Sequence, residues 1–294
     1  MTMRSAFVQF FQQEDVNFLL TNRVPRRLLT QFMGWFSQVE NPVVRRLSIS
    51  IWRLFAEVDL GEAKTTQFRS MHDCFIRQLK DGARPIDRDP AVLISPCDAI
   101  VGACGRIDND TLIQAKGQSY TLLELLGDAE LARLYRSGSY VTLRLSSGMY
   151  HRFHAPHDCR IRQVTYISGD TWNVNPIALK RVEKLFCRNE RVLLPVELEA
   201  SGDVVTLVPV AAILVASIRL HFVDVLLHLK YPGPNLIACD AVLRRGDEMG
   251  WFQHGSTVIV LAPGHFALCD KVALGATVRM GEPLLRARSV TAAV

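Results

Sequence analysis

The sequence predicts an α+β protein in which an N-terminal amphipathic helical arm precedes a β-rich single-domain core. Two patterns support this prediction. Basic and apolar residues interleave with helical spacing as far as about Phe55, whereas most of the later chain consists of short β-branched runs bounded by Gly, Asp, Asn or Pro. With 49% hydrophobic and 21% charged residues among 294, the chain can bury a sizeable core. We assign residues 1–65 to the arm and 66–294 to the core.

The predicted arm is basic, and Pro25 and Pro42 divide it into short helices. Arginines interrupt every apolar run before the length of about 18 residues that a membrane crossing needs, so we expect neither a signal peptide nor a spanning helix. Its apolar stripes could lie in an anionic membrane interface or pack on the rest of the protein, and both interpretations stay open. The interleaved residues are Arg26, Arg27, Leu28, Leu29, Phe32, Trp35, Phe36, Arg45, Arg46, Leu47, Ile51, Trp52, Arg53 and Phe55.

The core begins with a predicted helix over residues 68–79 and contains another over residues 122–135. Short β-branched runs predict its strands, because side chains branched at Cβ suit a pleated, half-buried surface. Residues 210–218 form an almost entirely apolar run, which we interpret as one further buried strand. The main predicted strands are residues 92–94, 99–103, 140–145, 160–167, 192–198, 204–210 and 257–261.

The tetrapeptide His254-Gly255-Ser256-Thr257 precedes the last of these runs. Because glycine lacks a Cβ, the carbonyl of Gly255 can be approached closely, as an attack by the Ser256 hydroxyl on its own preceding peptide bond requires. The resulting ester could eliminate to release residues 1–255, leaving a dehydroalanine that hydrolyses to a pyruvoyl group on residues 256–294. The same tetrapeptide is also typical of a tight turn that leads into a strand.

Five further motifs accompany this tetrapeptide: 95–99 (SPCDA), 114–117 (QAKG), 150–156 (YHRFHAP), 173–176 (NVNP) and 186–191 (FCRNER). In composition and order they resemble the phosphatidylserine decarboxylases, from about Phe68 to about Leu285. The resemblance implies a proenzyme that cleaves itself between Gly255 and Ser256. It also implies a covalent pyruvoyl group, derived from Ser256, as the cofactor that converts phosphatidylserine to phosphatidylethanolamine and carbon dioxide.

The resemblance also assigns the site residues. Ser256 is the nucleophile of the cut and afterwards the pyruvoyl residue that forms a Schiff base with the substrate amine. His154 is the base that takes the Ser256 proton, and Asp98 is the carboxylate that orients the imidazole, as in other acyl-transfer sites. His151 donates the proton to carbon after carbon dioxide leaves. His254, where the family often carries Leu or Phe, is a competing base.

Two stretches depart from the family pattern. Cys97 and Ala99 stand beside Asp98, where the usual turn reads Pro-Ala-Asp-Gly, although the aspartate itself is kept. Residues 210–218 carry apolar side chains where relatives often have Gly, Thr or Asn, and we expect no ligand there.

A zinc hydrolase is an alternative suggested by side-chain spacing. His151, His154, His157 and Cys159 offer imidazole and thiolate groups at short intervals, and such a set can bind zinc. In an extended strand, however, these side chains alternate between faces, and no helical His pair with an adjacent Glu accompanies them. We therefore expect no metal ion.

The net charge of +5 indicates an anionic partner, and no nucleic-acid motif accompanies it. We expect phosphatidylserine and an anionic membrane surface as partners, and no nucleic acid. The two cleavage products should form a heterodimer, with a higher oligomer open, at the cytoplasmic face of the cell inner membrane. Two alternatives to this function remain: an uncleaved lipid-binding relative without activity, and a pyruvoyl decarboxylase that acts on another amino acid.

Overall fold

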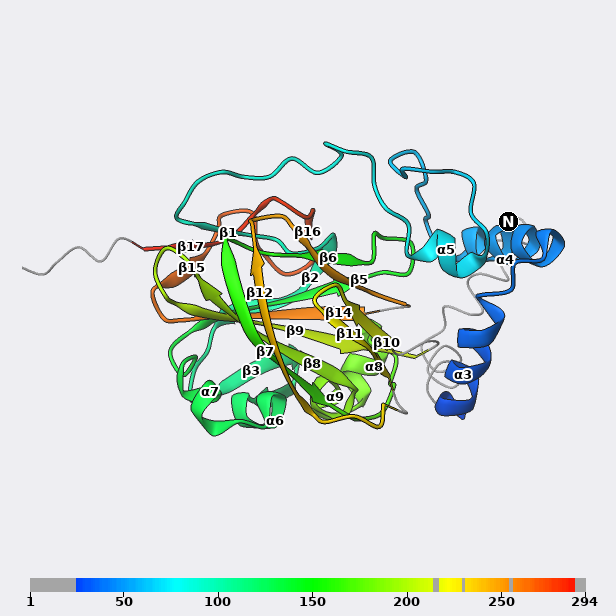
Figure 1. Cartoon of the computed structure of the whole chain (residues 1–294). Coiled ribbons are helices and arrows are strands. Elements are labelled where there is room, and N and C mark those ends of the chain that lie inside the picture. Colours follow the sequence, from blue (N-terminus) through cyan, green and yellow to red (C-terminus); the bar gives the residue numbers. More distant parts are fainter. Residues whose placement is uncertain (1–24, 214–216, 229–230, 254–255, 289–294) are drawn as a thin grey trace, which may run out of the picture.

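Two antiparallel sheets pack face to face in the computed structural model, which describes residues 25–213, 217–228, 231–253 and 256–288 (Figure 1). The predicted β-rich α+β core with a helical arm is confirmed. The helices are α3 (Arg26–Phe36), α4 (Pro42–Phe55), α5 (Met71–Phe75), α6 (Leu122–Leu126), α7 (Ala129–Arg133), α8 (Pro176–Arg181) and α9 (Leu185–Arg188). The strands are β1 (Val92–Ile94), β2 (Ala99–Arg106), β3 (Thr111–Ala115), β4 (Gln118–Thr121), β5 (Ser139–Leu145), β6 (Arg152–His154), β7 (Cys159–Ile167), β8 (Arg191–Leu198), β9 (Val204–Ala211), β10 (Ser217–Leu220), β11 (Val223–His228), β12 (Leu236–Leu243), β13 (Glu248–Phe252), β14 (Ser256–Ala262), β15 (Phe266–Leu268), β16 (Thr277–Val278) and β17 (Pro283–Ala287).

The larger sheet has the order β12-β7-β8-β9-β14-β5-β2-β16, and the smaller sheet has the order β11-β10-β13-β6. One apolar core, which includes Phe153, Phe252 and Val258, fills the space between these two sheets. A second core on the outer face of the larger sheet packs against the helices from α6 to α9, which lie below the strands in Figure 1. Strand β14 is buried along its whole length, because it is hydrogen-bonded to β9 and β5 and has a core on each face.

The arm helices lie at one side of the β-rich body, to the right in Figure 1. As predicted, α3 follows Pro25, and α4 begins at Pro42 with the Asn41 side chain capping its first turn. The Arg26 guanidinium joins the arm to the body, since it pairs with Asp170 at 2.6 Å and stacks over the Trp172 ring at 3.6 Å. Among the described residues, no helix has both the length and the apolar character that crossing a membrane requires.

The predicted helix over residues 68–79 is wrong beyond one turn. Helix α5 begins after the Ser70 cap and ends at Phe75. The carbonyl of Ile76 then accepts hydrogen bonds from Arg152 Nε at 2.8 Å and Nη2 at 2.6 Å instead of continuing a helical ladder. The chain therefore leaves the helix to reach a strand that is distant in sequence.

Two other predicted elements are divided. Residues 122–135 form α6 and α7 rather than one helix, because Gly127 takes a left-handed conformation with φ 65° and Asp128 caps the next helix. The single strand predicted over residues 210–218 is also wrong. Strand β9 ends at Ala211 in the larger sheet and β10 begins at Ser217 in the smaller one, so this apolar stretch connects the two layers.

Candidate active site

Ser256 opens the central strand β14 and lies in a row of four residues across the larger sheet. It pairs with Leu145 of β5 on one side and with Ala211 of β9 on the other. The Ala211 amide donates to Glu190 O at 2.8 Å, which continues this Ser256 row to the residue before β8. Residues directly opposed in antiparallel strands share a face, and Leu145 and Ala211 face the smaller sheet. The Ser256 side chain is fully buried, and its Oγ forms no hydrogen bond with the described residues.

The Ser256 row lies where the chain passes between the sheets. Strand β5 leads into β6, β9 into β10, and β13 into β14, and each pair joins the larger sheet with the smaller. Strands β5 and β9 end in the row, and β14 begins there. On the smaller sheet, Phe252 at the end of β13 pairs with Ile218 and donates to His151 O at 3.0 Å. We name this region, where the three connections meet, the crossover end.

His151 lies at the crossover end, one residue before β6. Its ring is fully buried and packs on the Phe75 ring, with 4.0 Å between centroids. Its Nδ1 lies 2.9 Å from Met149 O, and because a carbonyl oxygen only accepts, Nδ1 carries the hydrogen. The fold thus brings His151 to the same end of the sandwich as Ser256.

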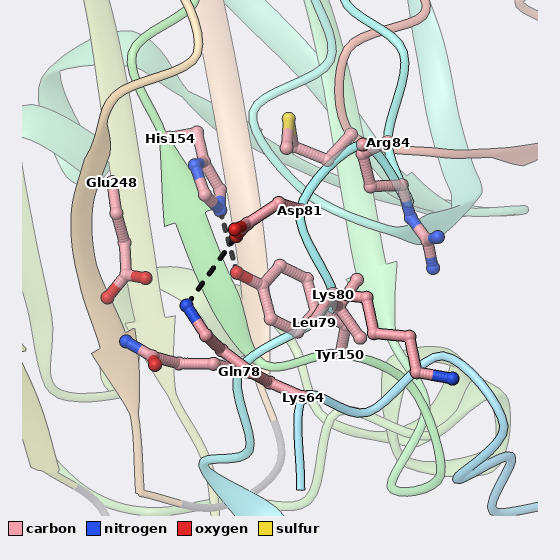
Figure 2. A pocket seen from close by; sticks show the side chains of 11 residues that line it. Lys64, Gln78, Leu79, Lys80, Asp81, Arg84, Tyr150, His154 and Glu248 are labelled. Atoms are coloured by element: carbon pink, nitrogen blue, oxygen red, sulfur yellow. Dashed lines mark hydrogen bonds and ion pairs between the residues drawn. The ribbon is translucent and has the colours of Figure 1, made fainter.

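His154 lies nearer the other end of β13, where it pairs with Glu248. The separation from Glu248 to Phe252 is about 13 Å of extended strand. His154 Nδ1 donates to Gly246 O at 2.8 Å, so Nε2 has no hydrogen and accepts from the Tyr150 hydroxyl at 3.0 Å (Figure 2). Burial lowers the pKa of His154, and the imidazole is therefore neutral near pH 7.

The His154 ring and Tyr150 line a pocket of about 230 Å³, in which three cations accompany two carboxylates (Figure 2). Lys64 pairs with Asp81 at 3.5 Å on the exposed side of this pocket. The lining residues are Lys64, Gln78, Leu79, Lys80, Asp81, Gly82, Arg84, Tyr150, His154, Glu248 and Met280.

Asp98 lies beside His154 without a hydrogen bond to it. The Asp98 carboxylate instead accepts from Arg84 Nε at 2.8 Å and Nη2 at 2.6 Å, and from the Met280 amide at 2.9 Å. The His154 amide donates to Pro96 O at 2.8 Å, which fixes the turn that carries Asp98 against β6. The negative charge of Asp98 acts to raise the pKa of His154, although burial outweighs this effect.

The predicted site residues therefore form two neighbouring groups. His151 shares the crossover end with Ser256, whereas His154 lines the pocket of Figure 2 together with Arg84, which binds Asp98. Neither Asp98 nor His154 is hydrogen-bonded to Ser256 within the described ranges. The predicted cleavage-site residue Gly255 and the competing base His254 lie outside the described residues. The charge-relay assignment stays a prediction.

The histidines considered as zinc ligands have separate partners. His157 Nε2 donates to Pro90 O at 3.1 Å, while His151 and His154 bind other carbonyl groups. In the part of the chain that the structure describes, no three His, Cys, Asp or Glu side chains are grouped as a metal site would require.

Three residues of the site received no role from the sequence. Tyr150 and Arg84 bind the predicted catalytic pair, and their partners could not be inferred from spacing. Glu190, the third, stands in motif 186–191 and shares alternation with the inward-facing Val192 and Leu194. That alternation is a signal that could have placed Glu190 inside the sandwich.

Glu190 is fully buried, and its two carboxylate oxygens form no hydrogen bond with the described residues. Burial raises the pKa of Glu190 from its ordinary value of 4.5 to about 8. The Tyr166 hydroxyl, which donates to His228 O at 2.8 Å, lowers this pKa only in part. The carboxyl group is therefore mostly protonated at neutral pH.

Comparison with known proteins agrees with the family resemblance of the sequence motifs. The sequence profile of the family described as phosphatidylserine decarboxylase matches residues 71–286. The chain is similar to three proteins named phosphatidylserine decarboxylase proenzyme. The Haemophilus influenzae protein is 36% identical over 274 residues, 89% of this chain and 92% of the relative. The Vibrio cholerae protein is 38% identical over 276 residues (88% and 94%), and the Klebsiella pneumoniae protein is 35% identical over 297 residues (95% and 90%).

The raised pKa of Glu190 predicts a pH-dependent stability. The folded chain holds a proton that the unfolded chain loses between pH 4.5 and about 8, so the free energy of unfolding should fall as pH rises through this window. Between pH 4.5 and about 8, the free energy of unfolding of Glu190→Gln should therefore rise relative to that of the protein with Glu190. This relative rise should be at most about 1.4 kcal/mol per pH unit. Urea unfolding at several pH values measures the difference, in a Ser256→Ala background that keeps the samples uniform. Glu197→Gln is the control, and a pH-independent difference for Glu190→Gln would contradict the assignment.

Proposed function

The chain belongs to the phosphatidylserine decarboxylase family, and on that premise we propose that it converts phosphatidylserine to phosphatidylethanolamine and carbon dioxide after cleaving itself before Ser256. The observation that carries the proposal is the environment of Ser256. Its hydroxyl is buried at the start of the central strand and has no hydrogen-bond partner among the described residues. A buried polar group without a partner costs stability, so it requires an explanation such as a chemical role.

The residues around Ser256 fit a pyruvoyl group made from it. Ala211 beside Ser256 has a short side chain, and His151 lies at the same end of the sandwich. When formed, a pyruvoyl group supplies an electrophilic ketone and an electron sink for the substrate amine. Leu145, Ala211 and the surrounding core would keep water away from residue 256.

His154 is the proposed base for the cut. Its Nδ1 hydrogen is held by Gly246 O, so Nε2 is the nitrogen that takes a proton. The Tyr150 hydroxyl is hydrogen-bonded to Nε2 in the precursor and must release it, and the two rings are tilted with their centroids 5.7 Å apart. The negative charge of Asp98 favours the imidazolium that forms, and the Arg84 guanidinium and the Met280 amide fix the carboxylate. Asp98 would thus act by charge rather than by a direct hydrogen bond.

His151 is the proposed proton donor to carbon. Because Met149 O holds the Nδ1 hydrogen, His151 would deliver a proton from Nε2, and it would do so from the imidazolium form, in which both ring nitrogens carry hydrogen. The Phe75 ring packs against the imidazole and restricts its rotation. These contacts support a fixed donor at the end of the sandwich where residue 256 lies.

We further propose that the arm docks on an anionic membrane at the cytoplasmic face. Helices α3 and α4 carry eight exposed large apolar side chains, with Trp35 67% and Leu47 60% exposed. An apolar groove of about 350 Å³ lies between these helices and Met71. On another side of α4, three arginines line a separate groove and make no ion pair within the described ranges. The arginines are Arg45, Arg46 and Arg53. An apolar surface next to unpaired guanidinium groups suits a lipid interface.

The two products of the cut are proposed to stay together as a heterodimer. Residues 256–262 are hydrogen-bonded to β5 and β9 on both edges, and β17 also pairs with β1. These ladders support a tight association between residues 1–255 and 256–294 without a covalent link.

The first prediction of this proposal concerns maturation. The expressed chain should yield residues 1–255 and 256–294, the shorter beginning with a pyruvoyl group, whereas Ser256→Ala should remain one chain because it has no nucleophile. A denaturing gel and the intact mass of the short chain measure both outcomes. Ser201→Ala, an exposed serine in a turn, is the matched control. Two chains from Ser256→Ala, or one chain from the wild type, would exclude self-cleavage at this serine and favour an uncleaved lipid-binding protein.

The two histidines should have separable effects. His154→Ala should slow the cut by roughly 10² to 10⁴-fold, since general-base assistance has that size. His151→Ala should still cleave but release carbon dioxide from phosphatidylserine poorly. A cleavage time course and labelled carbon dioxide measure the two steps. Normal maturation of His154→Ala would transfer the base role to His254 or His151, and full turnover by His151→Ala would exclude it as the donor.

Binding to vesicles should depend on the arm. Vesicles rich in phosphatidylserine should bind the protein less as salt rises, because screening weakens attraction to surface charge. Arg45→Glu with Arg46→Glu should weaken binding but leave the cut intact. Arg133→Glu with Arg136→Glu makes the same change of net charge on the β-rich body and should bind nearly as the wild type. Equal loss from both pairs would mean that net charge, rather than the arm, determines binding.

A further inference from the structure

We propose that Glu190 is a further catalytic residue: a neutral carboxylic acid that faces residue 256 across Ala211 and exchanges a proton with the ketone oxygen there. The inference rests on the proposed function, and it extends that function by assigning the acid that lets the substrate amine enter and the product amine leave.

The strand register of the larger sheet places Glu190 relative to Ser256. Glu190 and Ser256 both pair with Ala211, from opposite sides, so all three side chains share the face toward the smaller sheet. Adjacent strands are about 4.8 Å apart, which puts the Cα atoms of Glu190 and Ser256 about 10 Å apart. Ala211 is the residue between them, and its side chain is a single methyl group.

The backbone at Glu190 is held in place on its other side. Its amide donates to Asp170 O at 2.9 Å. A Cβ on Gly169 would lie 2.4 Å from Arg188 O and 2.7 Å from Glu190 N, so only glycine allows this close packing. The base of the Glu190 side chain is thus fixed by two neighbouring segments.

The charged side chains near Glu190 interact with other groups. Arg191, next in sequence, turns to the opposite face and donates to Leu125 O at 2.7 Å and Cys187 O at 2.6 Å. Asp170 pairs with Arg26 on the surface.

Tyr166 of β7 is the titratable side chain that Glu190 meets inside the sandwich, and its hydroxyl donates to His228 O. Glu190 therefore has no counter-ion in the described structure. A fully buried carboxyl group without a hydrogen bond destabilises the fold, so a purely structural role does not account for it.

The proton balance fits a neutral acid at this position. With a pyruvoyl group at residue 256, condensation of the substrate amine with the ketone would release the ketone oxygen as water, and this oxygen would need two protons, one from the amine and one from Glu190. Glu190 would then be a carboxylate opposite a cationic nitrogen, and the two charges would stabilise each other in the apolar interior. Glu190 would recover its proton when water returned and the product amine left.

The test uses the cleaved wild-type protein and three variants: Glu190→Gln, Glu190→Asp and, as the matched control, Glu197→Gln. Glu197 lies on β8, the strand that Glu190 directly precedes, but it accepts from Arg162 at 3.1 Å on the exposed side. The readouts are the two-chain gel, the rate at which the protein captures phenylhydrazine in the absence of phosphatidylserine, and carbon dioxide release from phosphatidylserine. Capture reports on the ketone without decarboxylation, and cleavage shows that the variant has folded.

We expect Glu190→Gln to cleave normally but to capture phenylhydrazine and turn over phosphatidylserine roughly 10² to 10⁴-fold more slowly. The wild-type capture rate should fall as pH rises above about 8, where Glu190 loses its proton, and this decline should disappear in Glu190→Gln. Glu190→Asp should keep the decline, since it retains a carboxyl group, and Glu197→Gln should behave as the wild type.

Wild-type capture by Glu190→Gln, or an unchanged decline with pH, would overturn the proposal. If Glu190→Gln does not cleave itself, the capture rate of Glu190→Asp tests the proposal instead. A rate of phenylhydrazine capture at least about tenfold below the wild-type rate, as a displaced carboxyl group predicts, supports the role of Glu190. A capture rate equal to that of the wild type overturns it. Failure of the wild type itself to cleave or to capture phenylhydrazine would instead refute the pyruvoyl group, and so distinguishes loss of the proposed function from loss of this inference.

Discussion

The position of β14 between β5 and β9 is the constraint on which the rest of the site depends. Because side chains alternate along a strand, the register of these two pairings decides which face Ser256 occupies. A slip of one residue would turn Ser256 toward the helices and bring Thr257 into the sandwich. The same register fixes Glu190 and Ala211 in line with Ser256, and the Phe252 hydrogen bond places His151 at the same end of the sandwich. Hydrogen bonds of the backbone thus set the geometry of groups that are far apart in sequence.

The interior of the sandwich favours uncharged acids and bases. Burial lowers the pKa of His154 and raises the pKa of Glu190, so both groups are predominantly neutral near pH 7. A neutral imidazole can accept a proton and a neutral carboxyl group can give one, which suits proton transfer in an apolar space. The Asp98 carboxylate, by contrast, is neutralised by Arg84 at 2.6 Å. Tyr150 links the two regions, because it belongs to the β5–β6 connection and its hydroxyl reaches His154.

Much of the fold could be predicted because its strands are β-branched runs with clear boundaries, as in β1, β7 and β8. The failures share one physical cause, namely contacts between distant residues. Nothing local shows that Arg152 binds the Ile76 carbonyl and ends α5, or that the apolar run after Val210 joins two sheets rather than extending one. The roles of Asp98, His151, His154 and Ser256 were assigned through family resemblance. Spacing alone could not indicate that Arg84, rather than His154, binds Asp98, and it left Glu190 without a role.

The central position of β14 in the larger sheet affects whether the cleaved protein could refold. In the uncut chain, β14 can insert between β5 and β9 by an intramolecular step, because it follows β13 of the smaller sheet in the same polypeptide. After a cut before Ser256, a denatured molecule would have to regain the same strand from a separate peptide, at a rate that depends on concentration. Only the uncut chain would then contain all the strands of the fold in one polypeptide. The mature enzyme would persist because it unfolds slowly, and a molecule that once came apart would be replaced rather than repaired.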